Sequence, residues 1–127
     1  MEKTVIRTEN APAPFQGAPY NQAIRVGDLV FVAGQLGLKP GDTAVEGDAA
    51  VQTEQVMRNL AAILEAAGSS LDNLVKTSVF LQDLGDFQAM NEVYARHVGE
   101  RPPARSTFEV AKLPSGALVE IEAVAHT

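Results

Sequence analysis

"PPARSTFEVAKLPSGALVEIEAVA", Pro102 to Ala125, decides how the end of this chain folds. Alternating apolar and polar residues on both sides of a Pro-Ser-Gly turn predict two β-strands. Arg105 opens the first strand, and Glu120 and Glu122 share one face of the second because they are two residues apart. The KLPSGA connection could close a hairpin or join strands that are not neighbours, and the pattern favours neither.

Length and composition limit the class of protein. The 127 residues are enough for a single domain, residues 1–127, with one real core. The 46% hydrophobic content is that of a soluble globular protein, and no apolar run is long enough to cross a bilayer. Because MEKTVIRTEN at the N-terminus has no apolar signal region, we expect a cytoplasmic protein that does not enter a membrane.

Charge and residue types exclude several kinds of chemistry. With 16 acidic and 10 basic residues the formal net charge is −6, and no basic cluster is present, so nucleic acid is a poor partner. The chain has no cysteine, which removes thiolate nucleophiles and thiol-based metal sites. His97 and His126 have no partner at metal-ligand spacing, so we expect no metal site and place His97 near a helix dipole. The chain also lacks a P-loop and a Gly-x-Ser-x-Gly elbow.

The remaining segments alternate between the two types of secondary structure. TVIRT, the AIRV segment and the apolar run Leu29 to Ala33 are strand candidates, and the last of these should be buried on both faces. Asp48 can cap a helix that ends before Gly68, with Val56, Leu60, Ile63, Leu64 and Ala67 on one stripe. Another strand follows at Leu74, and a second helix runs from Asp86 to Gly99. The order predicts an α+β fold with two helices on one face of a sheet.

Alternation in the later strands separates a core face from an outer face. If the apolar residues face the helices, the core contains Val75, Val79, Ile121, Ala123, Phe108 and Val110. The outer face then carries Lys76, Ser78, Arg105, Thr107, Glu109, Glu120 and Glu122, together with Leu74, Phe80, Leu118 and Val124. A solvated face is the ordinary interpretation. Apolar residues mixed with charges on an uncovered sheet instead favour burial against another subunit, with polar clefts between copies.

Four polar residues could form a site, and each has an ordinary structural explanation. Arg105, stiffened by two prolines, could clamp a carboxylate through two hydrogen bonds or make a surface ion pair. Glu120 could act as a general base on water or pair with a neighbouring cation, and Glu122 is equally placed. Tyr20 could line a pocket or anchor packing. Asn91 lies beside the apolar stripe of the second helix, where a simple hydrogen bond explains it at least as well.

The chain resembles the reactive intermediate deaminase family, also called RidA, YjgF or L-PSP-like. The resemblance spans nearly the whole chain and rests on TENAPAP, APYNQA, VAGQLG, VMRNLAAILEAAGSSLDNLVKTSVFLQDLGDFQAMNEVYARHV and RPPARSTFEVAKLPSGALVEIEAVA. It implies a chorismate-mutase-like α+β subunit with a mixed sheet, assembled as a homotrimer with active sites between subunits. It also implies hydrolysis of enamine or imine intermediates such as 2-aminoacrylate or 2-iminobutanoate to a 2-oxo acid and ammonia, without a cofactor.

The resemblance also implies roles for particular residues. Arg105 matches the family's carboxylate-binding arginine, and Glu120 matches its water-positioning glutamate. The residues expected to contact the small-molecule substrate are Tyr20, Gly34, Asn91, Thr107 and Phe87. Thr107 stands where many members have cysteine, a change that the reaction survives if this position contributes mainly its backbone. Ala33 replaces a common serine, which removes one possible hydrogen bond to substrate or water.

Two other functions remain open at this stage. Parts of the family carry the labels ribonuclease and translation inhibitor, and the acidic composition argues against both. Several branches of the family lack the arginine, so a noncatalytic trimer that binds metabolites or partner proteins, with a chaperone-like role, is the third hypothesis. The presence of Arg105 argues against it.

Overall fold

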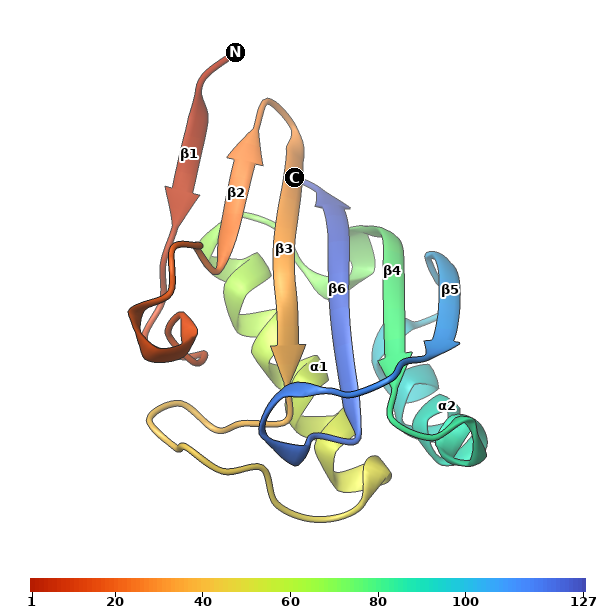
Figure 1. Cartoon of the computed structure of the whole chain (residues 1–127). Helices are drawn as coiled ribbons and strands as arrows, with labels where there is room; N and C mark the ends of the chain where they lie inside the picture. Colours follow the sequence, from red (N-terminus) through yellow and green to blue (C-terminus); the bar gives the residue numbers. More distant parts are fainter.

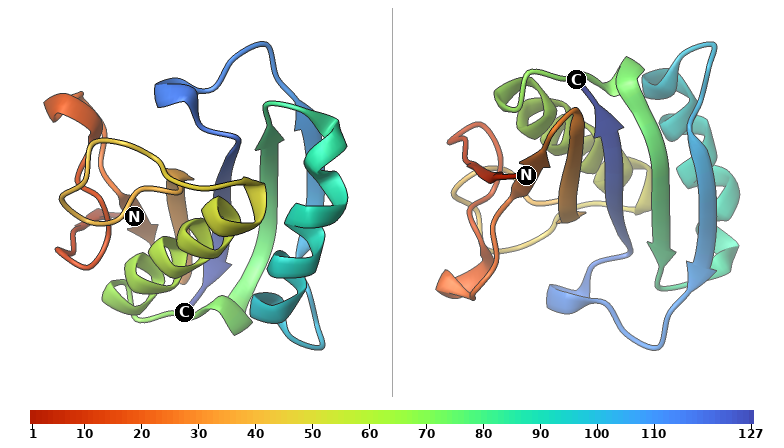
Figure 2. Two further views of the ribbon diagram at one scale, coloured as in Figure 1. Left: turned by 90° about the horizontal axis from the view of Figure 1, so that it is seen from below. Right: turned by 90° about the horizontal axis from the view of Figure 1, so that it is seen from above.

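The computed structural model describes all residues, 1–127, as one sheet with two helices on a single face (Figures 1 and 2). The strands are β1 Lys3–Ile6, β2 Ala23–Val26, β3 Leu29–Leu36, β4 Leu74–Leu81, β5 Ala104–Glu109 and β6 Val119–His126. The α-helices are α1 Ala49–Ala66 and α2 Phe87–Val98, and short 3-10 turns lie at Phe15–Gly17, Leu71–Asn73, Leu84–Asp86 and Pro114–Gly116. This arrangement confirms the predicted α+β fold. Neither helix is long and apolar enough to span a membrane.

The sheet is mixed, with strand order β1-β2-β3-β6-β4-β5. Every neighbouring pair is antiparallel except β4 and β5, which run parallel at the far edge. The Pro-Ser-Gly turn therefore joins strands that are not neighbours, because β4 lies between β5 and β6 (Figure 1). Ser115 takes the left-handed backbone conformation there, with φ of 58°.

Helix α1 begins and ends where the sequence predicts. The Asp48 side chain accepts a hydrogen bond from the Val51 N–H at 3.0 Å, which satisfies one of the free amides of the first turn. After Ala67 the chain turns at Gly68, whose φ of 80° favours glycine. The predicted stripe of α1 is buried and forms the centre of the core against the sheet: Val56, Leu60, Ile63, Leu64 and Ala67.

The predicted core is correct for β6 and wrong at two other positions. Val79, Ile121 and Ala123 are buried as expected and Val110 is half-buried, whereas Val75 and Phe108 are 45% and 55% exposed. A register shift between Leu74 and Lys76 turns Val75 outward and brings Leu74 into the core instead. Such a bulge is set by the pairing of β4 with β6, so the alternation within one strand does not reveal it.

The polar residues of β5 point to the opposite side from the one predicted. In the parallel ladder Arg105 pairs with Thr77 and Thr107 with Val79, and paired residues share a face. Because Thr77 and Val79 are fully buried toward the helices, Arg105, Thr107 and Glu109 also lie on the helix side of the sheet. The expectation that they share the outer face with Glu120 and Glu122 is wrong. At this sheet edge the helix side is only partly covered, which suits polar side chains.

The face of the sheet away from the helices is bare within the chain. Strand β3 buries Val30 and Val32 on the helix side, but Leu29 and Phe31 on the other side are 42% and 46% exposed. Only one face of this apolar run is therefore covered, although both were expected to be. Phe108 continues the same bare surface at the β5 edge. Exposed aromatic residues spread over a sheet face are typical of a surface that contacts another protein.

Candidate functional site

Arg105 lies under helix α2 without a partner of opposite charge. Its guanidinium carbon is 4.9 Å from the centre of the Tyr94 ring and 5.5 Å from that of Phe87, both within the range of cation–π attraction. Its only polar contact is weak: Nη1 is 4.0 Å from Met90 Sδ. The two ion pairs of the chain both involve Glu54, so the half-buried guanidinium keeps its donors free for an anion.

Tyr94 and Thr77 form a buried hydrogen bond beside this arginine. Their hydroxyl oxygens are 2.7 Å apart, and the residues are 5% and 0% exposed. Burial raises the pKa of Tyr94 above its ordinary value of 10.0, although the Thr77 hydrogen bond and the Arg105 charge act in the opposite direction. The phenol therefore stays neutral at physiological pH and presents an uncharged ring to the guanidinium.

Glu120 lies in a separate cleft of about 510 Å³ beside the C-terminal end of strand β3. Its carboxylate is packed against Gly34, where an added Cβ would lie 2.5 Å from Oε2 and 2.9 Å from Cδ of Glu120. Glycine is therefore the residue that lets the carboxylate sit against strand β3. Two predicted site residues, Gly34 and Tyr20, line this cleft with Glu120, and apolar side chains such as Phe15 and Leu38 complete it.

The environment of Glu120 suits a general base. Burial, and to a lesser degree the nearby charge of Glu122, raise the pKa of Glu120 above 4.5. A carboxylate whose ionised form is disfavoured in this way accepts a proton from water more readily than an exposed one.

Tyr20 is placed at the cleft by the irregular segment before β2. Its hydroxyl accepts a hydrogen bond from the Phe15 N–H at 2.7 Å, which closes the loop around the turn at Phe15–Gly17. The ring remains 43% exposed at the mouth of the cleft. Gln22 holds the other side of this loop through hydrogen bonds to Thr8, Ala11 and Pro12.

The predicted site is therefore divided into two halves on opposite faces of one sheet. Arg105 projects toward the helices, whereas Glu120 pairs with Phe80 and projects from the bare face. The structure brings Tyr20, Gly34 and Glu120 together and separately brings Phe87 to Arg105. A single chain does not offer both groups to one small ligand.

The other predicted residues lie near the arginine half. Asn91 is half-buried on α2, one turn after Phe87, and its side chain makes no hydrogen bond within the chain. Thr107 has a buried side-chain oxygen with no partner. The Val110 N–H donates to the Leu81 carbonyl. Successive strand residues point their backbone N–H groups to opposite edges of the strand. The Thr107 amide, three residues before Val110, therefore points away from β4 to the free edge of the sheet, where a ligand can reach it.

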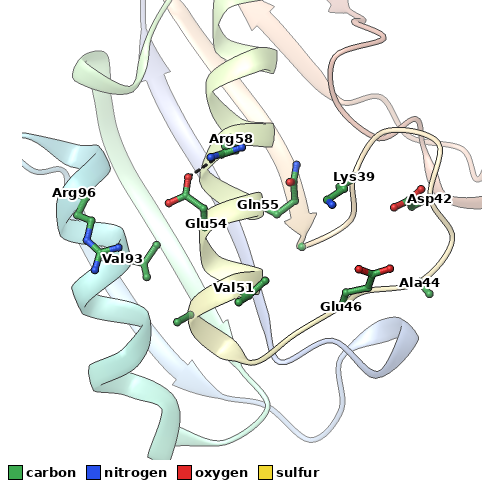
Figure 3. Close-up of a pocket in the computed structure, with 12 residues that line it drawn as sticks. Lys39, Asp42, Ala44, Glu46, Val51, Glu54, Gln55, Arg58, Val93 and Arg96 are labelled. Atoms are coloured by element: carbon green, nitrogen blue, oxygen red, sulfur yellow. Dashed lines mark hydrogen bonds and ion pairs between the residues drawn. The ribbon is translucent and has the colours of Figure 1, made fainter.

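A second cavity, of about 400 Å³, lies on the helix side and contains none of the predicted site residues (Figure 3). Glu54 is at its centre, and both carboxylate oxygens are used: Arg58 Nε and His97 Nε2 each lie 2.8 Å away. These contacts hold the pKa of Glu54 below 4.5. His97 of α2 thus contacts Glu54 of α1, in addition to lying near the C-terminal dipole of its own helix. Because Lys39 and the other charges around it face solvent, the cavity is a surface groove between α1, α2 and the loop before α1.

The hydrogen-bonded pair of Thr77 and Tyr94 beside Arg105 was not predicted from the sequence. Thr77 and Tyr94 were not among the residues predicted to form a site. Their hydroxyl groups were the available signal, because a buried tyrosine or threonine needs a hydrogen-bond partner. The chain brings together no group of three histidine or carboxylate side chains that could hold a metal ion.

The chain is similar to known proteins over nearly its whole length. Residues 8–127 match the family model described as endoribonuclease L-PSP. A RutC family protein of Pyrococcus horikoshii is 51% identical over 125 residues, which cover 98% of each chain. Reactive Intermediate Deaminase A, chloroplastic, of Arabidopsis thaliana is 44% identical over 126 residues, covering 98% of this chain and 66% of the plant protein.

Solved structures share the whole fold. RidA from an Antarctic Psychrobacter bacterium is 43% identical with a TM-score of 0.93, covering 98% of this chain and 99% of that one. TdcF of Escherichia coli, solved with bound serine, is 36% identical with a TM-score of 0.90, covering 98% of both chains.

Proposed function

Because this chain belongs to the endoribonuclease L-PSP family, which includes the RidA proteins, we propose that it hydrolyses reactive enamine and imine acids to 2-oxo acids and ammonia. A plant relative carries the name reactive intermediate deaminase, which supports the reaction class. Substrates of the size of 2-aminoacrylate, 2-iminopropanoate and 2-iminobutanoate are the ones we propose. In this proposal nucleic acid is not a partner.

The observation that carries the proposal is the free guanidinium of Arg105. It is half-buried, stacked on aromatic rings and without any carboxylate of its own chain. A partly desolvated cation with unused donors is a binding group for a small anion, and the fork of arginine matches a carboxylate through two parallel hydrogen bonds. The free Thr107 amide at the same strand edge can add a third donor. Serine bound to Escherichia coli TdcF supports a ligand of this size.

The proposed chemistry needs only a held carboxylate and a held water. The enamine takes a proton at its terminal carbon and becomes an iminium ion, whose central carbon is electrophilic. Water adds to that carbon while the Glu120 carboxylate accepts one of its protons. Glu120 then returns the proton to nitrogen, and the C–N bond breaks as the added oxygen forms the C=O bond and gives up its remaining proton. Ammonia leaves, and the oxygen of water remains in the 2-oxo acid. Because the substrate and the water are both held in position, the reaction needs no covalent nucleophile from the protein.

The placement of Arg105 and Glu120 on opposite faces supports a site shared between copies. We propose a homotrimer in which the bare sheet face of one copy, with its Glu120 cleft, packs on the β5 edge of the next. Leu29, Phe31 and Phe108 would lose their exposure in such a contact. A rotationally symmetric ring with one contact of this kind per pair yields identical sites.

Product release from freshly generated 2-aminoacrylate tests the proposed reaction. Wild-type protein should release 2-oxo acid and ammonia faster than a reaction without enzyme, and Arg105→Ala should be as slow as that blank. Arg101→Ala is the matched control, because Arg101 is an exposed arginine on the same connection. Equal rates for wild type and Arg105→Ala would rule out the proposed role of the guanidinium.

RNA cleavage is the second candidate, because the family model is described as an endoribonuclease. The net charge of −6 opposes it, since binding the phosphate backbone requires a basic surface. RNA cleavage that copurifies with the protein and persists in Arg105→Ala would favour this second function.

A further inference from the structure

An arginine that binds substrate must be held still, because its side chain is long and has many rotamers. A carboxylate can fix a guanidinium through paired hydrogen bonds, but Arg105 has no carboxylate partner. A carboxylate there would also compete with the substrate for the same donors. The structure instead holds the guanidinium by contacts that leave its donors free: the Tyr94 ring at 4.9 Å and the Phe87 ring at 5.5 Å.

Of these two rings, only that of Tyr94 is itself fixed at its far end. Phe87 is 40% exposed, whereas Tyr94 is 5% exposed and its hydroxyl lies 2.7 Å from the Thr77 hydroxyl. Thr77 is also the residue that pairs with Arg105 in the β4–β5 ladder. Strand β4 therefore determines both the backbone position of Arg105 and, through Tyr94, the plane on which its guanidinium rests.

We propose that Tyr94 and Thr77 are positioning residues that orient the Arg105 guanidinium for the substrate carboxylate without touching the substrate. The inference rests on the proposed function and names the support of its binding group. A ring whose face lies under the guanidinium carbon stabilises the charge without using any of the N–H donors. The buried hydroxyl pair keeps the ring from rotating away.

The alternative is that the hydroxyl pair only stabilises the fold, as buried hydrogen bonds do elsewhere. The two roles differ in what they predict for binding. A structural pair changes the stability of the protein and leaves the affinity of the folded protein for a carboxylate unaltered. A positioning pair changes that affinity even when stability is restored.

Substitutions at Tyr94 and Thr77 separate these roles. Tyr94→Phe should raise KM about fivefold with little change in kcat, because the arginine contact is made in both the substrate and the transition state. Tyr94→Leu, which also removes the ring, should raise KM about thirtyfold. Thr77→Val combined with Tyr94→Phe leaves no unpaired buried hydroxyl, so its thermal midpoint should return close to that of wild type while KM stays raised. Glu92→Gln, at an exposed position of α2, should change neither quantity.

Pyruvate binding, measured by calorimetry, distinguishes failure of this inference from failure of the proposed function. We expect wild type to bind pyruvate, Arg105→Ala to lose binding, and the Thr77→Val/Tyr94→Phe protein to bind it about fivefold more weakly. A folded double variant with wild-type affinity and wild-type KM overturns the positioning role and leaves the deaminase intact. Wild-type protein that neither binds pyruvate nor consumes 2-aminoacrylate overturns the proposed function, and the inference with it.

Discussion

Two inactive variants should restore each other's activity when their subunits are mixed. Arg105→Ala removes the group on the helix side of the sheet, and Glu120→Gln removes the group on its bare face. In the proposed trimer each site takes its arginine from one copy and its glutamate from the next. A site formed by an intact arginine of one variant and an intact glutamate of the other is therefore complete.

The expected size of this effect follows from random assembly. In an equal mixture, each site has an intact arginine half of the time and an intact glutamate half of the time, so about one quarter of the sites should work. A site built within one chain would give no complete copy in any mixture, because every chain lacks one of the two groups. A shared site thus predicts recovery of about one quarter of wild-type activity, whereas a site within one chain predicts no recovery.

The assay requires proof that the subunits have mixed. The two variants are unfolded together and refolded, mixed assemblies are identified by native mass spectrometry, and 2-oxo acid release from fresh 2-aminoacrylate is measured. An equal mixture of Arg105→Ala with the double variant Arg105→Ala/Glu120→Gln is the matched control, since Arg105 is absent from every subunit in it. Mixed assemblies that remain inactive would refute the shared site.

Three further predictions concern single residues. Gly34→Ala should leave the fold intact but lower kcat/KM by about two orders of magnitude. The new Cβ would lie 2.5 Å from Oε2 of Glu120, so the carboxylate must move by roughly 1 Å. Unchanged kinetics would contradict this prediction. Glu120 must be ionised to act as a base, so activity should fall as pH drops through its raised pKa. Glu122→Gln should lower that pKa and move the acid limb of the pH–rate profile to lower pH, and a limb that stays in place would exclude the coupling. Thr107→Val should raise the free energy of unfolding by about 1 kcal/mol, because it removes a buried hydroxyl that has no hydrogen-bond partner. The measurement is made at fixed protein concentration. A loss of stability would indicate that the hydroxyl has a partner in the assembly.

The local features of the fold were predictable because their causes are local. Asp48, the apolar stripe of α1 and Gly68 define that helix within one stretch of sequence, and the structure follows them. Val75 illustrates the limit. Its outward position depends on a register shift against β6, where Leu74 pairs with Ala125 and Lys76 with Val124, and no pattern within β4 contains that information.

Resemblance and pattern named the members of the candidate site, whose roles stay predictions, but they did not give its arrangement. Resemblance to a family pointed to Arg105 and Glu120, and alternation correctly grouped the residues that share each face of β5 and of β6. Alternation does not say which group faces the helices, because that depends on the partner strand and on what covers it. On β5 the apolar Phe108 was assigned to the core and the polar Arg105 to the surface, and the edge position of β5 reverses both.

The same edge position explains why this subunit would act only in an assembly. A guanidinium on the helix side of an interior strand would be enclosed, whereas on β5 it is stacked on Tyr94 and still open at the free edge of the sheet. Glu120 stands on the opposite face, in a cleft bordered by a bare apolar surface that includes Phe31. In the proposed trimer one contact covers that surface, brings a water-activating carboxylate to the arginine of the next copy and excludes bulk water from both. Assembly and catalysis would then depend on the same interface, so a change that loosens the contact lowers activity even when every catalytic side chain is intact.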